Sequence, residues 1–224
     1  GGCAGSGGGS AGSGGGSAGS GGGSAGSGGG SAGSGGSAGS GGGSPSGVFI
    51  NELYVDRALQ GDSVEWVEIA GPFQTALGGL RLRHYRFDDP GVTLVFDLPL
   101  GDAGDQIPSS GLWTVGGLMS EAMNRTYAIG APDHFGLDGT GGMLQLYRAS
   151  DGVLLDAVGY GTARSVDAPS APTTTMFGSA APLPAGGEKN QSLARRPGAS
   201  AHDNAADYCL QAPSANAPNG DACL

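Results

Sequence analysis

The first fifth of the chain is a repeat that cannot build a hydrophobic core. From Gly1 to about Gly47 the sequence cycles through Ala-Gly-Ser-Gly-Gly-Gly-Ser, with one shortened copy at Ala32 to Ser37. No position of this repeat carries an apolar side chain larger than Ala, so burial cannot offset the entropy that ordering would cost. We therefore expect a disordered tether over residues 1–47, with a root-mean-square span of roughly 35 to 40 Å.

After Pro45 the composition changes, and residues 48–224 predict one β-rich domain with a sizeable core. Short runs of β-branched and aromatic residues are closed by Gly, Pro, Asp or Ser, which is typical of strands and turns. Asp151-Gly152 between two apolar runs indicates a hairpin. We expect strands over 48–55, 64–69, 80–87, 92–98, 112–115, 143–147 and 153–160, a hint of helix at 120–124, and a surface loop or insertion from 167 to 187.

About seven short strands with frequent turn signals predict an all-β fold with two packed sheets. In this fold Trp66 is expected in the core, because it lies inside an apolar strand. The neighbouring Glu65 and Glu68 are expected to be solvated or bonded to loop backbone.

The charge balance argues against a nucleic acid partner. The chain has 20 acidic and 10 basic residues, a formal net charge of -10, and no run of Lys or Arg. Proteins that bind duplexes gain affinity by neutralising phosphates with clustered cations. A local basic patch on this acidic protein stays possible, for instance around Arg81, Arg83 and Arg86.

Three cysteines leave an odd number to explain. A bond between Cys209 and Cys223 would close a loop of about 15 residues and stabilise the C-terminal region by on the order of 3 kcal/mol. The alternative is two free thiols in a cytosolic protein. We favour the disulfide, because the other features of the chain indicate export.

The environment of Cys3 resembles the processed end of a bacterial lipoprotein, where a Cys after small residues is acylated and a spacer leads to the folded domain. This resemblance implies a lipid anchor at Cys3 and a place in the bacterial cell envelope, at the outer membrane or cell surface, or otherwise secretion. A membrane would then be met through the anchor only, since no stretch has the length and apolarity of a spanning helix. The competing interpretation is an engineered linker with a labelling cysteine.

The sequence offers no catalytic residue and no cofactor site that we would nominate. Gly8 to Gly12 matches the G-x-S-x-G nucleophile motif, but the strand and helix that the motif needs are missing on either side. His84, His134 and His202 have no partners at zinc-ligand spacing and are expected at the surface or in turns. One of the three hypotheses for this chain is a hydrolase, which would need Ser, His and Asp brought together by the fold. The other two are given below.

Two acidic clusters offer the oxygen ligands that calcium takes. Asp203, Asn204 and Asp207 supply short oxygen ligands close together, and Asp102 with Asp105 forms a smaller group. The favoured alternative is that these side chains cap turns by accepting hydrogen bonds from nearby backbone N–H groups. No metal is therefore assigned.

Three segments of the chain, taken in order, carry a recognisable set of motifs. The first pairs Val48-Phe49-Ile50-Asn51-Glu52 with Val64-Glu65-Trp66-Val67-Glu68-Ile69, followed by Leu77-Gly78-Gly79-Leu80. The second runs from Gly141-Gly142-Met143-Leu144-Gln145-Leu146-Tyr147 through Asp151-Gly152 to Leu155-Asp156-Ala157-Val158-Gly159-Tyr160-Gly161. The third joins Ser192-Leu193-Ala194-Arg195-Arg196-Pro197 with Asp203-Asn204-Ala205-Ala206-Asp207-Tyr208 and Pro213 to Asn219.

Together these segments resemble the lamin tail domain of bacterial exported proteins. This resemblance implies an immunoglobulin-like β-sandwich, usually an accessory module in surface or secreted proteins, and no single activity. Our first hypothesis is a non-enzymatic interaction or structural module in the cell envelope, displayed on the tether. It would bind an unknown protein or envelope component through loops such as 84–92 and 101–110. The second hypothesis is a nucleic-acid-binding or nuclease-associated module, because lamin tail domains are linked to DNA and to exported nucleases. It requires a basic face containing Arg81, Arg83 and Arg195.

Overall fold

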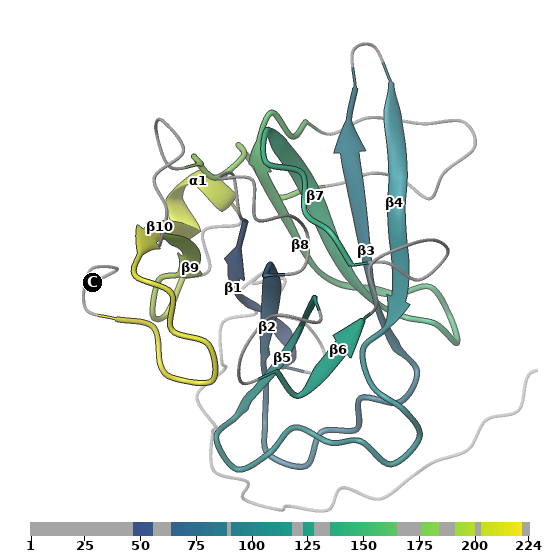
Figure 1. Cartoon of the computed structure of the whole chain (residues 1–224). Helices are drawn as coiled ribbons and strands as arrows, with labels where there is room; N and C mark the ends of the chain where they lie inside the picture. The colour runs from purple at the N-terminus through teal and green to yellow at the C-terminus, as the bar shows by residue number, and fades with distance from the viewer. Residues whose placement is uncertain are drawn as a thin grey trace, which may run out of the picture. The chain divides into compact units, whose positions relative to one another are not determined.

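The computed structural model describes residues 47–55, 64–88, 91–117, 123–127, 135–164, 176–183, 191–199 and 203–220. These residues form an all-β body of two sheets with one short helix (Figure 1). The predicted tether and Cys3 lie outside the described residues, so both stay predictions.

The larger sheet has six strands in the order β10-β9-β1-β2-β5-β6. Neighbouring strands are antiparallel, except that β6 runs parallel to β5. The C-terminal strands β9 and β10 therefore extend the sheet beside the first strand of the body. The strands are β1 (Phe49–Tyr54), β2 (Trp66–Ala70), β5 (Leu112–Gly117), β6 (Arg125–Tyr127), β9 (Ser192–Arg195) and β10 (Tyr208–Gln211).

The smaller sheet is antiparallel and has four strands in the order β4-β3-β7-β8. The predicted Asp151-Gly152 hairpin joins β7 to β8, and Gly152 adopts a φ of 70°, which Gly reaches without strain. The strands are β3 (Leu80–Phe87), β4 (Val92–Pro99), β7 (Gly141–Arg148) and β8 (Leu154–Gly161).

The main core lies between the sheets and follows the alternation of strand side chains. Leu80 and Leu82 of β3 are buried in it, while the interleaved Arg81 and Arg83 are only half-buried. Trp66 is buried as predicted and stacks against Tyr54, with ring centroids 6.0 Å apart. Both inner faces contribute large side chains, including Ile50, Leu53, Val67, Ile69, Phe96, Leu98, Leu144, Leu146, Val158 and Tyr160.

The seven predicted strands are confirmed as β1, β2, β3, β4, β5, β7 and β8, with small shifts at their ends. Strands β6, β9 and β10 were not predicted. The helix lies at α1 (Asn204–Asp207), whereas Met123 and Asn124, the described part of the expected helix, are not helical.

Residues 176–183 of the expected surface loop from 167 to 187 form no helix or strand, and Gly178, Ser179 and Pro182 are exposed, but the segment also packs on the smaller sheet. Ala181 is fully buried and forms a bridge with Tyr160 of β8. Its backbone N–H donates to Gly159, and its carbonyl accepts from Gly161. The segment therefore covers the edge of the smaller sheet, where unpaired backbone groups would otherwise lie open.

In the part of the chain that the structure describes, the helix is too short to span a membrane.

Candidate functional site

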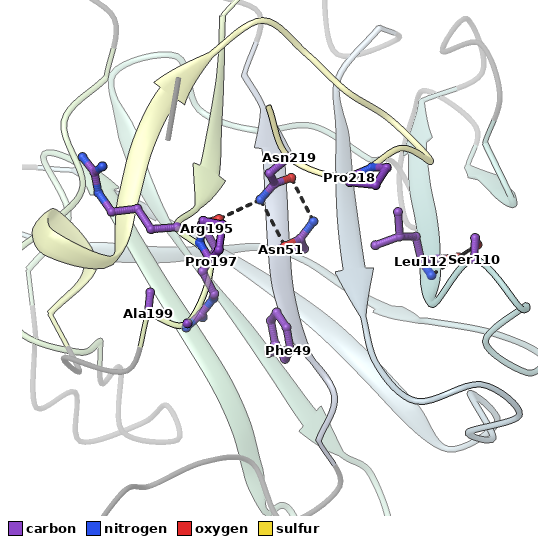
Figure 2. Close-up of a pocket in the computed structure, with 11 residues that line it drawn as sticks. Phe49, Asn51, Ser110, Leu112, Arg195, Pro197, Ala199, Pro218 and Asn219 are labelled. Carbon is purple, nitrogen blue, oxygen red and sulfur yellow. Dashed lines mark hydrogen bonds between the residues drawn. The ribbon is translucent and has the colours of Figure 1, made fainter. Parts of the chain in front are cut away.

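A groove of about 520 Å³ opens where four separate stretches of the chain meet beside the six-stranded sheet (Figure 2). Apolar and amide groups share its lining, a mixture common in binding sites. The lining residues are Phe49 and Asn51 of β1, Ser110 and Leu112 near β5, residues 195–199 after β9, and Pro218 and Asn219 near the end of the described chain.

Pro218 and Asn219 form the C-terminal wall of this groove, and two asparagines set its position. Asn51 donates through Nδ2 to Asn219 Oδ1 at 3.0 Å, and Asn219 donates back to Asn51 Oδ1 at 3.2 Å. The Nδ2 of Asn219 also lies 2.8 Å from the carbonyl oxygen of Arg195 (Figure 2). The paired amides join β1, the C-terminal wall and the end of β9.

Arg195 is the centre of a second set of contacts. Its Nε donates to the carbonyl oxygen of Ile50 at 3.1 Å, and its Nη2 donates to Asp156 Oδ2 at 2.6 Å. Asp156 also accepts the backbone N–H of Ile50 at 2.8 Å. The hydroxyl of Tyr208 donates to the same Ile50 carbonyl at 2.7 Å, and its ring lies 5.0 Å from the Arg195 guanidinium. One arginine thus links β1, β8, β9 and β10.

Burial and neighbouring charges act in opposite directions on this ion pair. Burial raises the pKa of the Asp156 carboxyl, and the charge of Arg195 opposes that rise. Burial would lower the pKa of Arg195, but Tyr208 and Asp156 raise it above its ordinary value. Arg195 therefore stays a cation, and its charge is directed into the protein.

Glu52 and Glu68 hold the segment that forms the C-terminal wall. The backbone N–H of Ser214 donates to Glu52 Oε1 at 3.0 Å, and that of Asn216 donates to Glu68 Oε2 at 2.6 Å. Glu65, for which we expected solvent or loop backbone, accepts the N–H of Leu137 at 2.5 Å. Of the two expected outcomes for Glu65 and Glu68, bonding to loop backbone is the one observed.

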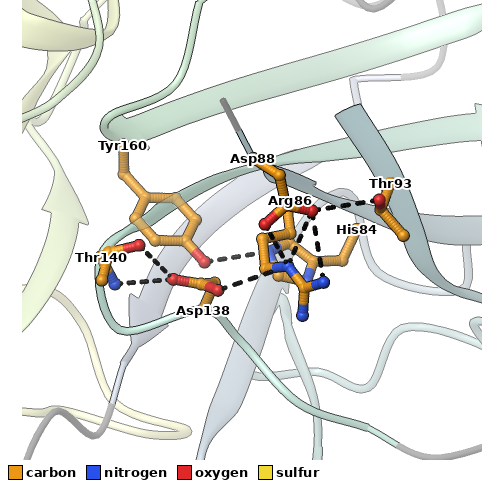
Figure 3. A network of polar contacts seen from close by, with 7 residues as sticks. All are labelled: His84, Arg86, Asp88, Thr93, Asp138, Thr140 and Tyr160. Atoms are coloured by element: carbon orange, nitrogen blue, oxygen red, sulfur yellow. Dashed lines mark hydrogen bonds and ion pairs between the residues drawn. The ribbon is translucent and has the colours of Figure 1, made fainter. Parts of the chain in front are cut away.

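A network of polar contacts in the smaller sheet runs from the buried His84 and Tyr160 to exposed residues such as Arg86 and Asp88 (Figure 3). His84 Nε2 is 3.0 Å from the Tyr160 hydroxyl, and the two rings stack with centroids 6.2 Å apart. Asp138 accepts from Thr140 and lies 3.9 Å from Arg86. Burial raises the pKa of Tyr160 well above its usual value.

The expectation that His84 is a surface or turn residue is therefore wrong, because its side chain has no solvent exposure. It occupies an inward position of β3, where it also packs against Phe96 at 5.4 Å. The hydroxyl of Tyr160 is one partner of its imidazole. His134 and His202 lie outside the described residues.

Among the calcium candidates, Asp203 caps a helix and Asn204 forms side-chain hydrogen bonds to the backbone of β8. Asp203 Oδ1 accepts the backbone N–H groups of Ser179 at 2.8 Å and Ala205 at 3.2 Å, and so caps α1. Asn204 is buried and bonds the backbone of Gly159 and Ala157 in β8. Asp207 is buried in the same helix. Within the described ranges, no group of three or more His, Cys, Asp or Glu residues could hold a metal ion.

All three arginines of the nucleic acid hypothesis are paired with aspartates. Arg81 and Arg83 of β3 both bind Asp97, at 2.7 and 2.8 Å, and Arg83 also lies 3.8 Å from the Tyr147 ring centroid. Arg195 belongs to the other sheet and binds Asp156. A basic face that contains all three stays a prediction.

Of the two loops expected to carry binding, the first is largely part of β3, whereas much of 101–110 is exposed and its Ser110 lines the groove. Residues 84–87 belong to β3, and 89–90 lie outside the described residues. In the stretch 101–110, Ile107 is buried and exchanges backbone hydrogen bonds with residues 74 and 75. Arg125 lies 3.0 Å from Asp102 and 3.8 Å from Asp105, so the second acidic cluster contains an arginine.

Cys209 lies in β10 and is buried against Ala194 of β9. Cys223 lies outside the described residues, so the bond between these two cysteines stays a prediction.

Sequence reasoning missed the Asn51–Asn219 pair and the role of the two glutamates. Asn51 and Asn219 are 168 residues apart, and nothing local marks them as partners. The available signal was that Asn51, Glu52, Glu68 and Asn219 all belong to the segments that resemble the lamin tail domain.

Comparison with known proteins gave no match to any family model, curated protein or solved structure.

Proposed function

We propose that this chain is a non-enzymatic interaction module of the lamin tail type, with an immunoglobulin-like sandwich displayed on a tether at the bacterial cell envelope. Cys3 would carry the lipid anchor. The groove beside the six-stranded sheet would receive a segment of a partner protein or another envelope component.

One observation carries this proposal: two of the three segments that resemble the lamin tail domain line the groove, and the other binds one of the lining residues. The first supplies Phe49 and Asn51, and the third supplies Arg195 and Asn219. The second reaches the same place through Asp156, which binds Arg195 and the backbone of Ile50. A resemblance spread over 170 residues thus corresponds to one place in the fold.

The groove has the properties of a preformed binding surface. Asn51 and Asn219 fix each other, and Arg195 is held by Ile50 and Asp156, so these groups lose little further freedom when a ligand binds. Phe49 and Leu112 add apolar surface. This arrangement favours recognition by shape and a few hydrogen bonds.

The test is a cross-linking pull-down from a bacterial envelope fraction with the full chain and two double variants. Ser110→Arg with Pro218→Arg places bulky side chains at exposed positions of the groove. Leu94→Arg with Gln106→Arg adds the same charge at exposed positions outside it. We expect the wild type and the second variant to recover the same partner, and the groove variant to lose it.

Recovery of that partner by the groove variant at the wild-type level would contradict the groove as the binding surface. Repeated failure of the wild type to recover any partner would contradict the interaction module itself.

A further inference from the structure

The C-terminal segment 212–220, here called the strap, is attached largely through polar contacts. Ser214 donates to Glu52 through its backbone N–H at 3.0 Å and through its hydroxyl at 2.5 Å. Asn216 donates its backbone N–H to Glu68 at 2.6 Å. Gly220 donates to the Gln211 side chain, also at 2.6 Å. The strap has few large apolar side chains, so these hydrogen bonds dominate its attachment.

The two carboxylates that hold the strap are direct neighbours. Glu52 of β1 and Glu68 of β2 are register partners, and neither is exposed to solvent. Side chains directly opposite each other in antiparallel strands lie about 5 Å apart, and like charges there repel. The strap therefore covers two acidic groups that would repel each other if both were ionised.

We propose that the strap is a pH-responsive wall of the groove, which is held most tightly when Glu68 keeps its proton beside Glu52 and loosens when Glu68 becomes charged.

The environment of Glu68 supports this proposal from each element packed against it. From β1 come the charge of Glu52 and the amide of Asn51, which donates at 2.8 Å. From β5 comes the neutral register partner Thr114, and from the strap comes the N–H of Asn216. Burial raises the pKa of Glu68 to about 7, the hydrogen bonds from Asn51 and Asn216 oppose the rise, and Glu52 adds to it.

The direction of the pH effect follows from linkage. When the strap opens, water reaches Glu68 and its pKa returns toward the ordinary value of 4.5. The closed state then binds a proton more tightly than the open state does. Closure is fully favoured at low pH, and part of that free energy is lost as the pH rises from about 5 through 7.

The strap also forms part of the groove, since Pro218 and Asn219 line it. Asn219 reaches Asn51 and the carbonyl oxygen of Arg195, so loosening the strap would change the shape of that wall. This consequence for binding rests on the proposed function. The pH response of the strap does not.

Amide hydrogen exchange of the full chain, followed by mass spectrometry from pH 5.5 to 8.5 and corrected for intrinsic rates, tests the proposal without any partner. We expect protection of the strap to fall by up to about tenfold between pH 6 and pH 8, relative to a core peptide covering β7. Glu68→Gln should remove this pH dependence. Asp88→Asn, an exposed change on the β3–β4 hairpin, should leave it as in the wild type.

A ¹³C NMR titration of the wild-type carboxyl groups supplies a second measurement, which does not require the variant to fold. The Glu68 signal should titrate near pH 7. Strap protection that does not change with pH in the wild type, or a Glu68 carboxyl that titrates near 4.5, would overturn the proposal. Neither outcome depends on the pull-down, so the two proposals can fail separately.

Discussion

Glu52 and Glu68 face each other across β1 and β2, and both accept hydrogen bonds from the backbone of the same C-terminal segment. Their neighbours include the Asn51–Asn219 pair and the Arg195–Asp156 pair. Polar residues that could serve chemistry in another fold here join distant parts of the chain. This arrangement leads to specific expectations for stability.

Replacing Glu68 with Gln should change the pH dependence of global stability. The pKa of Glu68 is raised in the folded state, so the folded protein binds more protons than the unfolded chain between about pH 4.5 and 7. Its contribution to the free energy of unfolding therefore falls as pH rises through this window, by on the order of 1 to 3 kcal/mol. The check is urea unfolding at pH 5, 6, 7 and 8.

Gln cannot ionise, so the free energy of unfolding of the Glu68→Gln variant should lack this part of the pH dependence. The matched control is Asp88→Asn, whose carboxyl has a lowered pKa because of Arg86 and has already ionised below this window. Parallel stability curves for the wild type and Glu68→Gln would contradict the expectation.

Replacing Gly142 with Ala should destabilise the protein by about 1 to 3 kcal/mol. A methyl group at Gly142 would collide with His84 Nε2 and would lie 2.8 Å from the Tyr160 hydroxyl. Both groups are buried and packed against each other, so neither can move away easily. Thermal unfolding measures the effect.

Gly91→Ala is the control, because a methyl group there meets no atom within 4 Å. This substitution should leave the midpoint of thermal unfolding unchanged or raise it slightly. Equal effects of the two substitutions would show that space around Gly142 is not limiting.

The predicted Cys209–Cys223 bond and the acyl group at Cys3 can be examined together by intact mass analysis of the protein from its native source. A disulfide lowers the mass by about 2 Da, and acyl chains raise it by several hundred. If the bond is present, its reduction should cost on the order of 3 kcal/mol of stability. A mass equal to that of the reduced, unmodified chain would remove both predictions.

Much of the fold was predictable because the strands carry their own signals. Leu80 and Leu82 alternate with Arg81 and Arg83, and Asp151-Gly152 marks a turn, so these elements follow from local patterns. By contrast, β9 (Ser192–Arg195) and β10 (Tyr208–Gln211) contain only four residues each. They are strands because β9 pairs with β1 and β10 pairs with β9. The sequence of a four-residue segment does not show which strand it will pair with.

The candidate site was less predictable, because each of its contacts joins residues far apart in the sequence. Asp203 and Asn204 were recognised as polar residues suited to turns, and Asp203 does cap a helix. The partner of Asn204 is the backbone of β8, 45 residues earlier. The burial of His84 follows from the strand pattern, because it continues the buried alternation of Leu80 and Leu82 in β3.

The central claim is that the three family-like segments form one structural unit around Arg195. A double-mutant cycle with Arg195→Met and Asp156→Asn, measured by urea unfolding, tests it most directly. Each single change leaves a buried partner without its bond, so we predict a coupling free energy of about 2 kcal/mol or more. The exposed pair of Arg148 and Asp151, treated in the same way, should show little coupling. A coupling between Arg195 and Asp156 as small as that of the exposed pair would contradict the account.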